Sequence, residues 1–141
     1  MRKHESVLEH GVATFRFITD RGVTHEMVRH RIASYSQEST RYCNYSKDKF
    51  GNELTIILPI RFYEIWLKMN FSGGTIPDYF LPILSRYKNW YNGITAFEHY
   101  YFDALNFGDS PQEARDLLPN SLKTEIVMTA NFREWRNFFI F

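Results

Sequence analysis

The densest group of residues able to bind an anion is Arg29-His30-Arg31, followed by Ser39-Thr40-Arg41. A guanidinium supplies paired hydrogen bonds and a fixed positive charge, and the hydroxyls beside Arg41 add donors, so this stretch has the chemistry of a phosphate site. Residues two apart on a helix point about 200° from each other, so we expect Arg29 and Arg31 to face two anionic groups on opposite sides unless the helix ends between them. The alternative is that Arg-His-Arg at a helix end only interacts with the negative pole of the helix and its unpaired carbonyls.

Metal chemistry and nucleophilic catalysis are not indicated by the remaining residues. With Cys43 as the only cysteine, an intramolecular disulfide is excluded and no structural zinc site is predicted. Ser39 has no GxSxG context, so we do not predict a hydrolase nucleophile. The other histidines lack metal-ligand spacing, and we predict no metal: His4, His10, His25 and His99.

Composition restricts the classes of protein that the chain could be. Its 141 residues include 17 Lys+Arg and 16 Asp+Glu, a net charge of +1, which disfavours a nucleic-acid-binding module that relies on phosphate contacts. Hydrophobic residues at 44% and aromatic residues at 18% exclude a disordered chain and predict an aromatic-rich core in one domain. No apolar run reaches the roughly 18 residues of a membrane span, so we expect a cytoplasmic protein without a membrane partner.

The elements that must position these residues follow from periodicity in the first half of the chain. Alternation over Gly11–Asp20 predicts a strand, and helical spacing over Val23–Arg31 predicts a short helix capped by Asp20 or Thr24. Residues 32–49 are polar without a clear period, and we expect a long ordered loop. Residues 54–58 are expected to be extended, and residues 61–71 to be helical.

The second half is expected to contain the longest helix. Residues 72–75 break the preceding helix, and apolar residues then recur every three or four positions from Phe80 to Leu105. Ser110-Pro111-Gln-Glu113 has the pattern of a helix start, followed by a short helix to residue 118. Residues 124–129 read as extended, and Asn131 begins a final helix. Without a parallel βαβ rhythm, this order predicts an α+β fold.

The whole pattern resembles the flavin-dependent thymidylate synthases. Arg29-His30-Arg31, seven residues, and then Ser39 match that family's RHR-x7-S signature. The resemblance spans the chain apart from residues 47–105. Further matches lie on either side of the signature, in the family's order: His4-Glu5-Ser6 with Glu9-His10, Phe15 and Phe17, His25-Glu26, Ala114-Arg115 with Leu118-Pro119, and Thr129 with Asn131, Arg133 and Asn137.

This resemblance implies a reaction, cofactors and an assembly. Members of the family convert dUMP to dTMP, with methylenetetrahydrofolate as one-carbon donor and NADPH as reductant through bound FAD. It implies an antiparallel sheet with long helices, and homotetramers whose active sites are shared between subunits. No protein nucleophile is required, because reduced flavin delivers hydride to the base.

The resemblance also assigns residues. Those implied to contact FAD are Ser6, Glu9, Arg29, His30, Arg31, Ile32 and Gln37, with Asn131, Arg133 and Asn137 supplied by another subunit. Those implied to bind dUMP are Glu26, Arg29, Gln37, Glu38, Ser39, Thr40, Arg41 and Arg115.

Two departures from the family pattern define a second hypothesis. Only three residues precede His4, and the family arginine that helps to ionise the uracil ring would fall just beyond Phe141. We therefore expect a single domain, residues 1–141, that lacks the family's N-terminal segment, its closing helices and a catalytic residue. The alternative to an enzyme is a truncated remnant that binds FAD or dUMP without turnover. The aromatic long helix and the apolar C-terminal run are expected to need a partner, such as a second copy.

Overall fold

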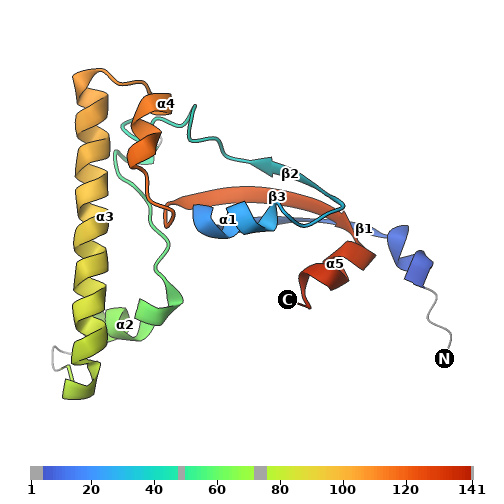
Figure 1. Cartoon of the computed structure of the whole chain (residues 1–141), viewed down its shortest axis with the longest axis horizontal. Helices are drawn as coiled ribbons and strands as arrows, with labels where there is room; N and C mark the ends of the chain where they lie inside the picture. The colour runs from blue at the N-terminus through green and yellow to red at the C-terminus, as the bar shows by residue number, and fades with distance from the viewer. Residues whose placement is uncertain (1–4, 48–49, 72–75, 141) are drawn as a thin grey trace. The chain divides into compact units, whose positions relative to one another are not determined.

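The computed structural model describes residues 5–47, 50–71 and 76–140. The chain divides into two compact units, each with its own apolar core (Figure 1). The first combines the two ends of the chain, Met1–Ser39 and Lys123–Phe141, and the second is the intervening Thr40–Leu122. No helix in the described part of the chain is long and apolar enough to cross a membrane.

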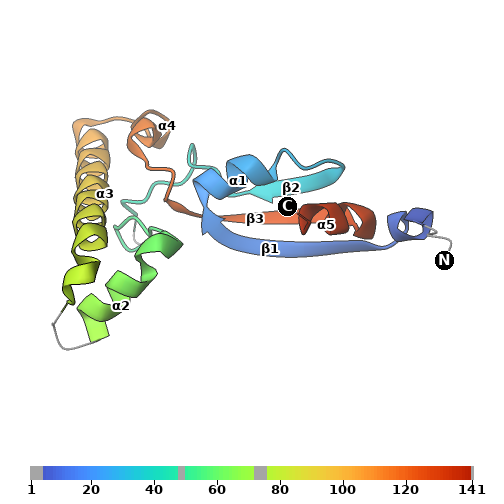
Figure 2. The same ribbon diagram turned by 60° about the horizontal axis from the view of Figure 1, so that its bottom comes forward.

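A three-stranded antiparallel sheet forms the framework of the first unit. Strand β3 (Lys123–Asn131) lies between β1 (Val12–Asp20) and β2 (Ala33–Gln37), as Figure 2 shows. Met128 of β3 is paired with Phe15 on one side and Tyr35 on the other. Alternate residues of β3 are buried, because only one face of the sheet is covered within this unit.

Two short helices cover that face (Figure 2), and a one-turn helix precedes the sheet. Helix α1 (Arg21–Met27) follows β1 directly, α5 (Phe132–Phe138) follows β3, and η1 (Glu5–Glu9) lies before β1. The core between helices and sheet consists of Met27, Ile126, Met128, Ala130 and Trp135. The Trp135 indole N–H also donates to the Ala13 carbonyl at 3.2 Å, which attaches α5 to β1.

The second unit is helical. Helix α2 (Tyr63–Phe71), preceded by η3 (Ile60–Phe62), packs on the N-terminal half of α3 (Leu81–Phe107), and η4 (Asp78–Phe80) leads into α3. Helix α4 (Pro111–Ala114) and η5 (Arg115–Leu117) lie by its other end (Figure 1). Tyr87 and Tyr101 are the buried residues of α3, one in each of this unit's two apolar clusters.

Most of the predicted elements are confirmed. The α+β class, strands β1 and β3 and the long helix are as expected, and α3 ends at Gly108, whose φ of 106° favours glycine. Asp20 caps α1 through a 2.7 Å hydrogen bond from the Val23 N–H, and the Ser110–Glu113 capping box begins α4. Of residues 54–58, only Ile56 is bridged, to Leu122. The predicted break at 72–75 lies outside the described residues.

Three boundaries were wrong. Residues 33–37, expected in a loop, form β2, because Ala33, Tyr35 and Gln37 face the covered side while Ser34 and Ser36 face outward, a strand pattern obscured by polar side chains. The first helix begins at Arg21 and ends at Met27, so Arg29-His30-Arg31 lies in the turn beyond it. The helix after Ser110 leaves the α conformation at Ala114 and ends as η5 at Leu117.

Candidate functional site

A pocket of about 440 Å³ opens in the first unit where three segments meet. Helix η1, the turn after α1 and helix α5 all contribute to it. Six of its lining residues were predicted to contact flavin, the last three of them from another subunit: Glu9, Arg31, Ile32, Asn131, Arg133 and Asn137. The other three lining residues are Glu134, Arg136 and Ile140.

Helix α5 supplies most of the polar groups because its first turn is fixed at the end of β3. The Asn131 side-chain oxygen accepts a hydrogen bond from the Glu134 N–H at 2.9 Å, as an N-cap does. Residues three and four apart share a helix face, which brings Arg133, Arg136 and Asn137 to the same side of α5. A buried strand, a side-chain cap and a helical repeat thus place these side chains.

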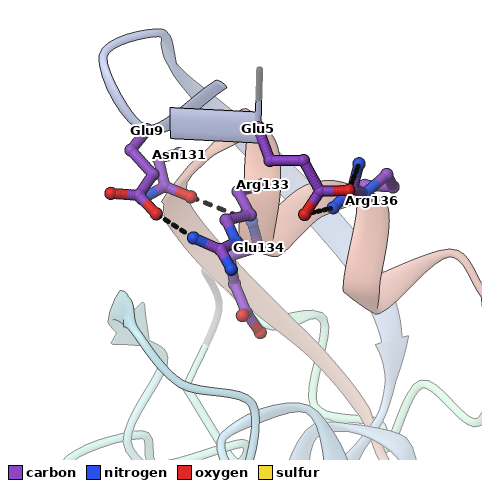
Figure 3. A network of polar contacts seen from close by, with 6 residues as sticks. All are labelled: Glu5, Glu9, Asn131, Arg133, Glu134 and Arg136. Atoms are coloured by element: carbon purple, nitrogen blue, oxygen red, sulfur yellow. Dashed lines mark hydrogen bonds and ion pairs between the residues drawn. The ribbon is translucent and has the colours of Figure 1, made fainter. Parts of the chain in front are cut away.

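Two ion pairs connect η1 to α5 at the edge of this pocket (Figure 3). Arg133 bonds to the Glu9 carboxylate, and Arg136 lies 3.2 Å from a carboxylate oxygen of Glu5. Both pairs are partly exposed, so their contribution to stability is small. Their consequence is positional, because they hold two guanidinium groups beside the pocket.

The Arg-His-Arg turn divides its side chains between different surroundings. Successive N–H groups, of Arg29 and His30, bond back to the carbonyls of Glu26 and Met27, both at 3.1 Å. The Arg29 side chain is exposed and pairs with Glu26 at 3.2 Å, whereas Arg31 lines the pocket. The two arginine side chains therefore lie in different surroundings, and their binding of two separate anionic groups stays a prediction. The structure brings Glu26 and Arg29 together.

A second hollow of about 370 Å³ lies next to the first and shares Arg31 and Ile32 with it. His30 and Tyr35 also line this hollow, and the Tyr35 hydroxyl is within 2.7 Å of the Met27 carbonyl and 2.9 Å of the His30 carbonyl. Burial raises the pKa of Tyr35, and the negative charge of Glu134 raises it further. Tyr35 therefore stays protonated and holds the turn by donating to these carbonyls.

Gln37 and Glu38 line a third hollow, of about 500 Å³, with Arg16 and Glu125. The Gln37 amide also donates to the hydroxyl oxygens of Thr24, at 2.8 Å, and Thr124, at 3.3 Å. The pKa of the Glu125 carboxyl is lowered mainly by its hydrogen bond from Lys123. Two of the residues predicted to bind dUMP thus lie together, in a hollow separate from that of Arg31.

The remaining predicted residues line none of these three hollows. Ser6 is exposed on η1, and Ser39 is the last residue of the first unit's N-terminal segment. The other three belong to the second unit: Thr40 is buried, the Arg41 guanidinium lies 5.7 Å from the centre of the Tyr42 ring, and Arg115 begins η5. The roles of these residues in binding dUMP stay predictions.

Three residues of the site were missed in the sequence. Glu5, Glu134 and Arg136 carry charges at or beside this pocket, although none was a candidate. Helical spacing could have indicated two of them. Glu134 stands three positions after Asn131, which begins the helix, and Arg136 stands three positions after Arg133.

The donor set of the pocket fits part of a flavin dinucleotide. Its arginines can pair with a diphosphate, its two asparagine amides can both donate and accept, and exposed Ile32 offers an apolar contact to a planar ring. The volume lies near the lower end of about 300–1,000 Å³ for ligand pockets, enough for a portion of FAD. Among the described residues, no group of three or more His, Cys, Asp or Glu could hold a metal ion.

Comparison with known proteins identifies relatives. The family model for the thymidylate synthase complementing protein matches residues 1–141. Proteins named flavin-dependent thymidylate synthase match with 34% identity in Pyrococcus furiosus, 36% in Sulfolobus acidocaldarius and 31% in Geobacter sulfurreducens. These matches cover 96%, 95% and 96% of this chain, and 48%, 43% and 50% of those proteins. The chain thus spans about half the length of the curated relatives it matches.

Proposed function

The chain belongs to the thymidylate synthase complementing protein family, and from that premise we propose that it binds FAD and dUMP for the reductive methylation of dUMP to dTMP. The observation that carries this proposal is the pocket in which Glu9, Arg31–Ile32 and Asn131–Asn137 come together. The relatives are named for their dependence on flavin, which supports FAD as the ligand.

The residues of the pocket would act by binding and orientation. Arg31 and Arg133 would hold phosphate oxygens through charge-assisted hydrogen bonds, while the Asn131 and Asn137 amides would fix polar edges of the ligand. When bound, FAD would carry reducing equivalents from NADPH to the base, with methylenetetrahydrofolate as the one-carbon donor. For dUMP, we propose Glu26, Arg29 and the stretch from Gln37 to Arg41, together with Arg115.

Arg133 provides a direct test of the flavin site. Arg133→Ala should weaken FAD binding by about 30-fold, or ~2 kcal/mol, because it removes a charge-assisted partner from a pocket residue. The measurement is a titration that follows quenching of flavin fluorescence. Arg86→Ala is the matched control, because Arg86 is an exposed arginine of α3 in the other unit.

The possible results separate the hypotheses. FAD binding that is weakened in Arg133→Ala and unchanged in Arg86→Ala supports the site. Wild-type binding without dTMP formation corresponds to the alternative, a remnant without turnover. Absence of FAD binding, or equal affinity in all three proteins, would refute the proposed flavin pocket.

We further propose that copies of the chain associate in the cytoplasm. The resemblance to the family implies that the assembly is a homotetramer. Large apolar side chains on α3 are exposed, among them Tyr100 and Phe107. Light scattering should then give a mass above that of one chain, and a monomer at micromolar concentration would contradict this.

A further inference from the structure

Glu134 carries a buried carboxylate that is incompletely satisfied. The residue is 9% exposed, and among the described residues its Oε1 atom has no hydrogen-bond partner. Its backbone N–H is committed to the Asn131 cap, which fixes the residue in the first turn of α5. A buried carboxylate oxygen without a donor is costly, so the group that faces it indicates its use.

The group that faces Glu134 Oε1 is the imidazole of His30. Its Nδ1 atom lies 3.8 Å from that oxygen, and both side chains are largely buried. The His30 ring also packs edge-on against Phe138, with 4.9 Å between ring centres. Because Phe138 and Glu134 both belong to α5, one helix contacts two sides of the ring.

The two arginines of α5 are directed elsewhere. Arg133 and Arg136 bond to Glu9 and Glu5, and the Glu134 carboxylate points away from both ion pairs (Figure 3). The Tyr35 hydroxyl is within hydrogen-bond distance of the Met27 and His30 carbonyls, so its single proton is directed to the backbone. Among the described residues, His30 is the basic side chain that makes an ion-pair contact with Glu134.

The contact lies between two hollows, because Glu134 lines the first and His30 the second. We propose that Glu134 is a positioning residue for His30, whose Nδ1–H donates to the carboxylate while the Nε2 edge is presented to bound flavin. The statement that the Nε2 edge faces flavin rests on the proposed function. The 3.8 Å separation is longer than a hydrogen bond, so the proposal requires the two side chains to approach to about 3 Å in solution, before flavin binds.

The first test needs no flavin. Nitrogen-15 NMR at about pH 8, where an ordinary histidine is neutral, distinguishes a proton on Nδ1 from one on Nε2. His30 signals are assigned by their loss in His30→Asn. We expect the Nδ1–H form in the wild type and a smaller excess of that form in Glu134→Gln, because a neutral amide oxygen accepts more weakly than a carboxylate. Glu64→Gln is the control, because it removes the same charge from an exposed position in the other unit.

The second test measures the consequence for the ligand. In a flavin fluorescence titration, Glu134→Gln should bind FAD about tenfold more weakly, while Glu64→Gln should match the wild type. Wild-type His30 in the Nε2–H form would overturn the proposal without any variant, as would a Gln variant that keeps both the Nδ1–H form and wild-type affinity. If the wild type binds no FAD, the proposed function fails, and the NMR result still decides the contact.

Discussion

Asn131 combines two roles that a pair of substitutions can separate. Its side-chain oxygen accepts the 2.9 Å hydrogen bond that caps α5, and the same residue lines the pocket proposed for flavin. Asn131→Ala removes the acceptor and should lower the free energy of unfolding by about 1 kcal/mol. Asn131→Asp keeps an acceptor of equal capping ability, so the free energy should change by less than about 0.5 kcal/mol.

Flavin binding should respond differently from stability. Asp supplies a negative charge and no amide donor to a pocket expected to hold a diphosphate, so Asn131→Asp should weaken FAD binding by about tenfold or more. The assays are hydrogen exchange of α5 and β3 amides and a FAD fluorescence titration. Ser110→Ala is the control, because it removes the cap of α4 in the other unit and should leave FAD binding unchanged.

Two results would contradict the roles assigned to Asn131. If Asn131→Asp destabilises α5 as much as Asn131→Ala, the cap is not what fixes the helix. If Asn131→Asp is stable and binds FAD as the wild type does, the residue does not contact the flavin.

Three further predictions concern the fold. Ile126→Ala should lower the free energy of unfolding by about 3 kcal/mol, because the Ile126 side chain is 0% exposed. Ile18 is 56% exposed, so Ile18→Ala should lower it by less than about 1 kcal/mol. Equal losses in urea unfolding would refute the assigned sheet faces. Gly108→Ala should cost about 1 kcal/mol because of the φ of 106°, and an unchanged melting temperature would contradict that conformation. The pKa of the Glu113 carboxyl is held below its ordinary 4.5 by the Ser110 hydroxyl, so its stabilising contribution is present above pH 4.5 and is lost as the pH falls through the lowered value. In an NMR titration, Ser110→Ala should raise the pKa of Glu113, and an unchanged value would exclude that hydrogen bond.

Local patterns predicted the elements whose stability comes from nearby residues. The Ser110 capping box and the Asp20 cap both depend on neighbours within a few positions, and the structure contains each one. Strand β2 was missed because its outward residues are serines and its partner β3 lies about 90 positions later. Pairing over that distance leaves no local signal in the sequence.

The candidate site was likewise predicted only in part from the sequence. The resemblance located the Arg-His-Arg turn and the Asn131–Asn137 segment, but the short lists of motif residues omitted Glu134 and Arg136. These two residues belong to the site because helix α5 places them beside the motif residues. The division of the chain into two units was also not indicated, since segments from both ends build one sheet.

The most direct test of the account is hydrogen exchange of the chain with and without FAD, read by mass spectrometry. Peptides that contain residues 5–10, 28–33 and 131–138 should gain protection together, because these segments meet at one pocket. Saturable FAD binding that leaves all three segments unprotected would contradict the proposed site.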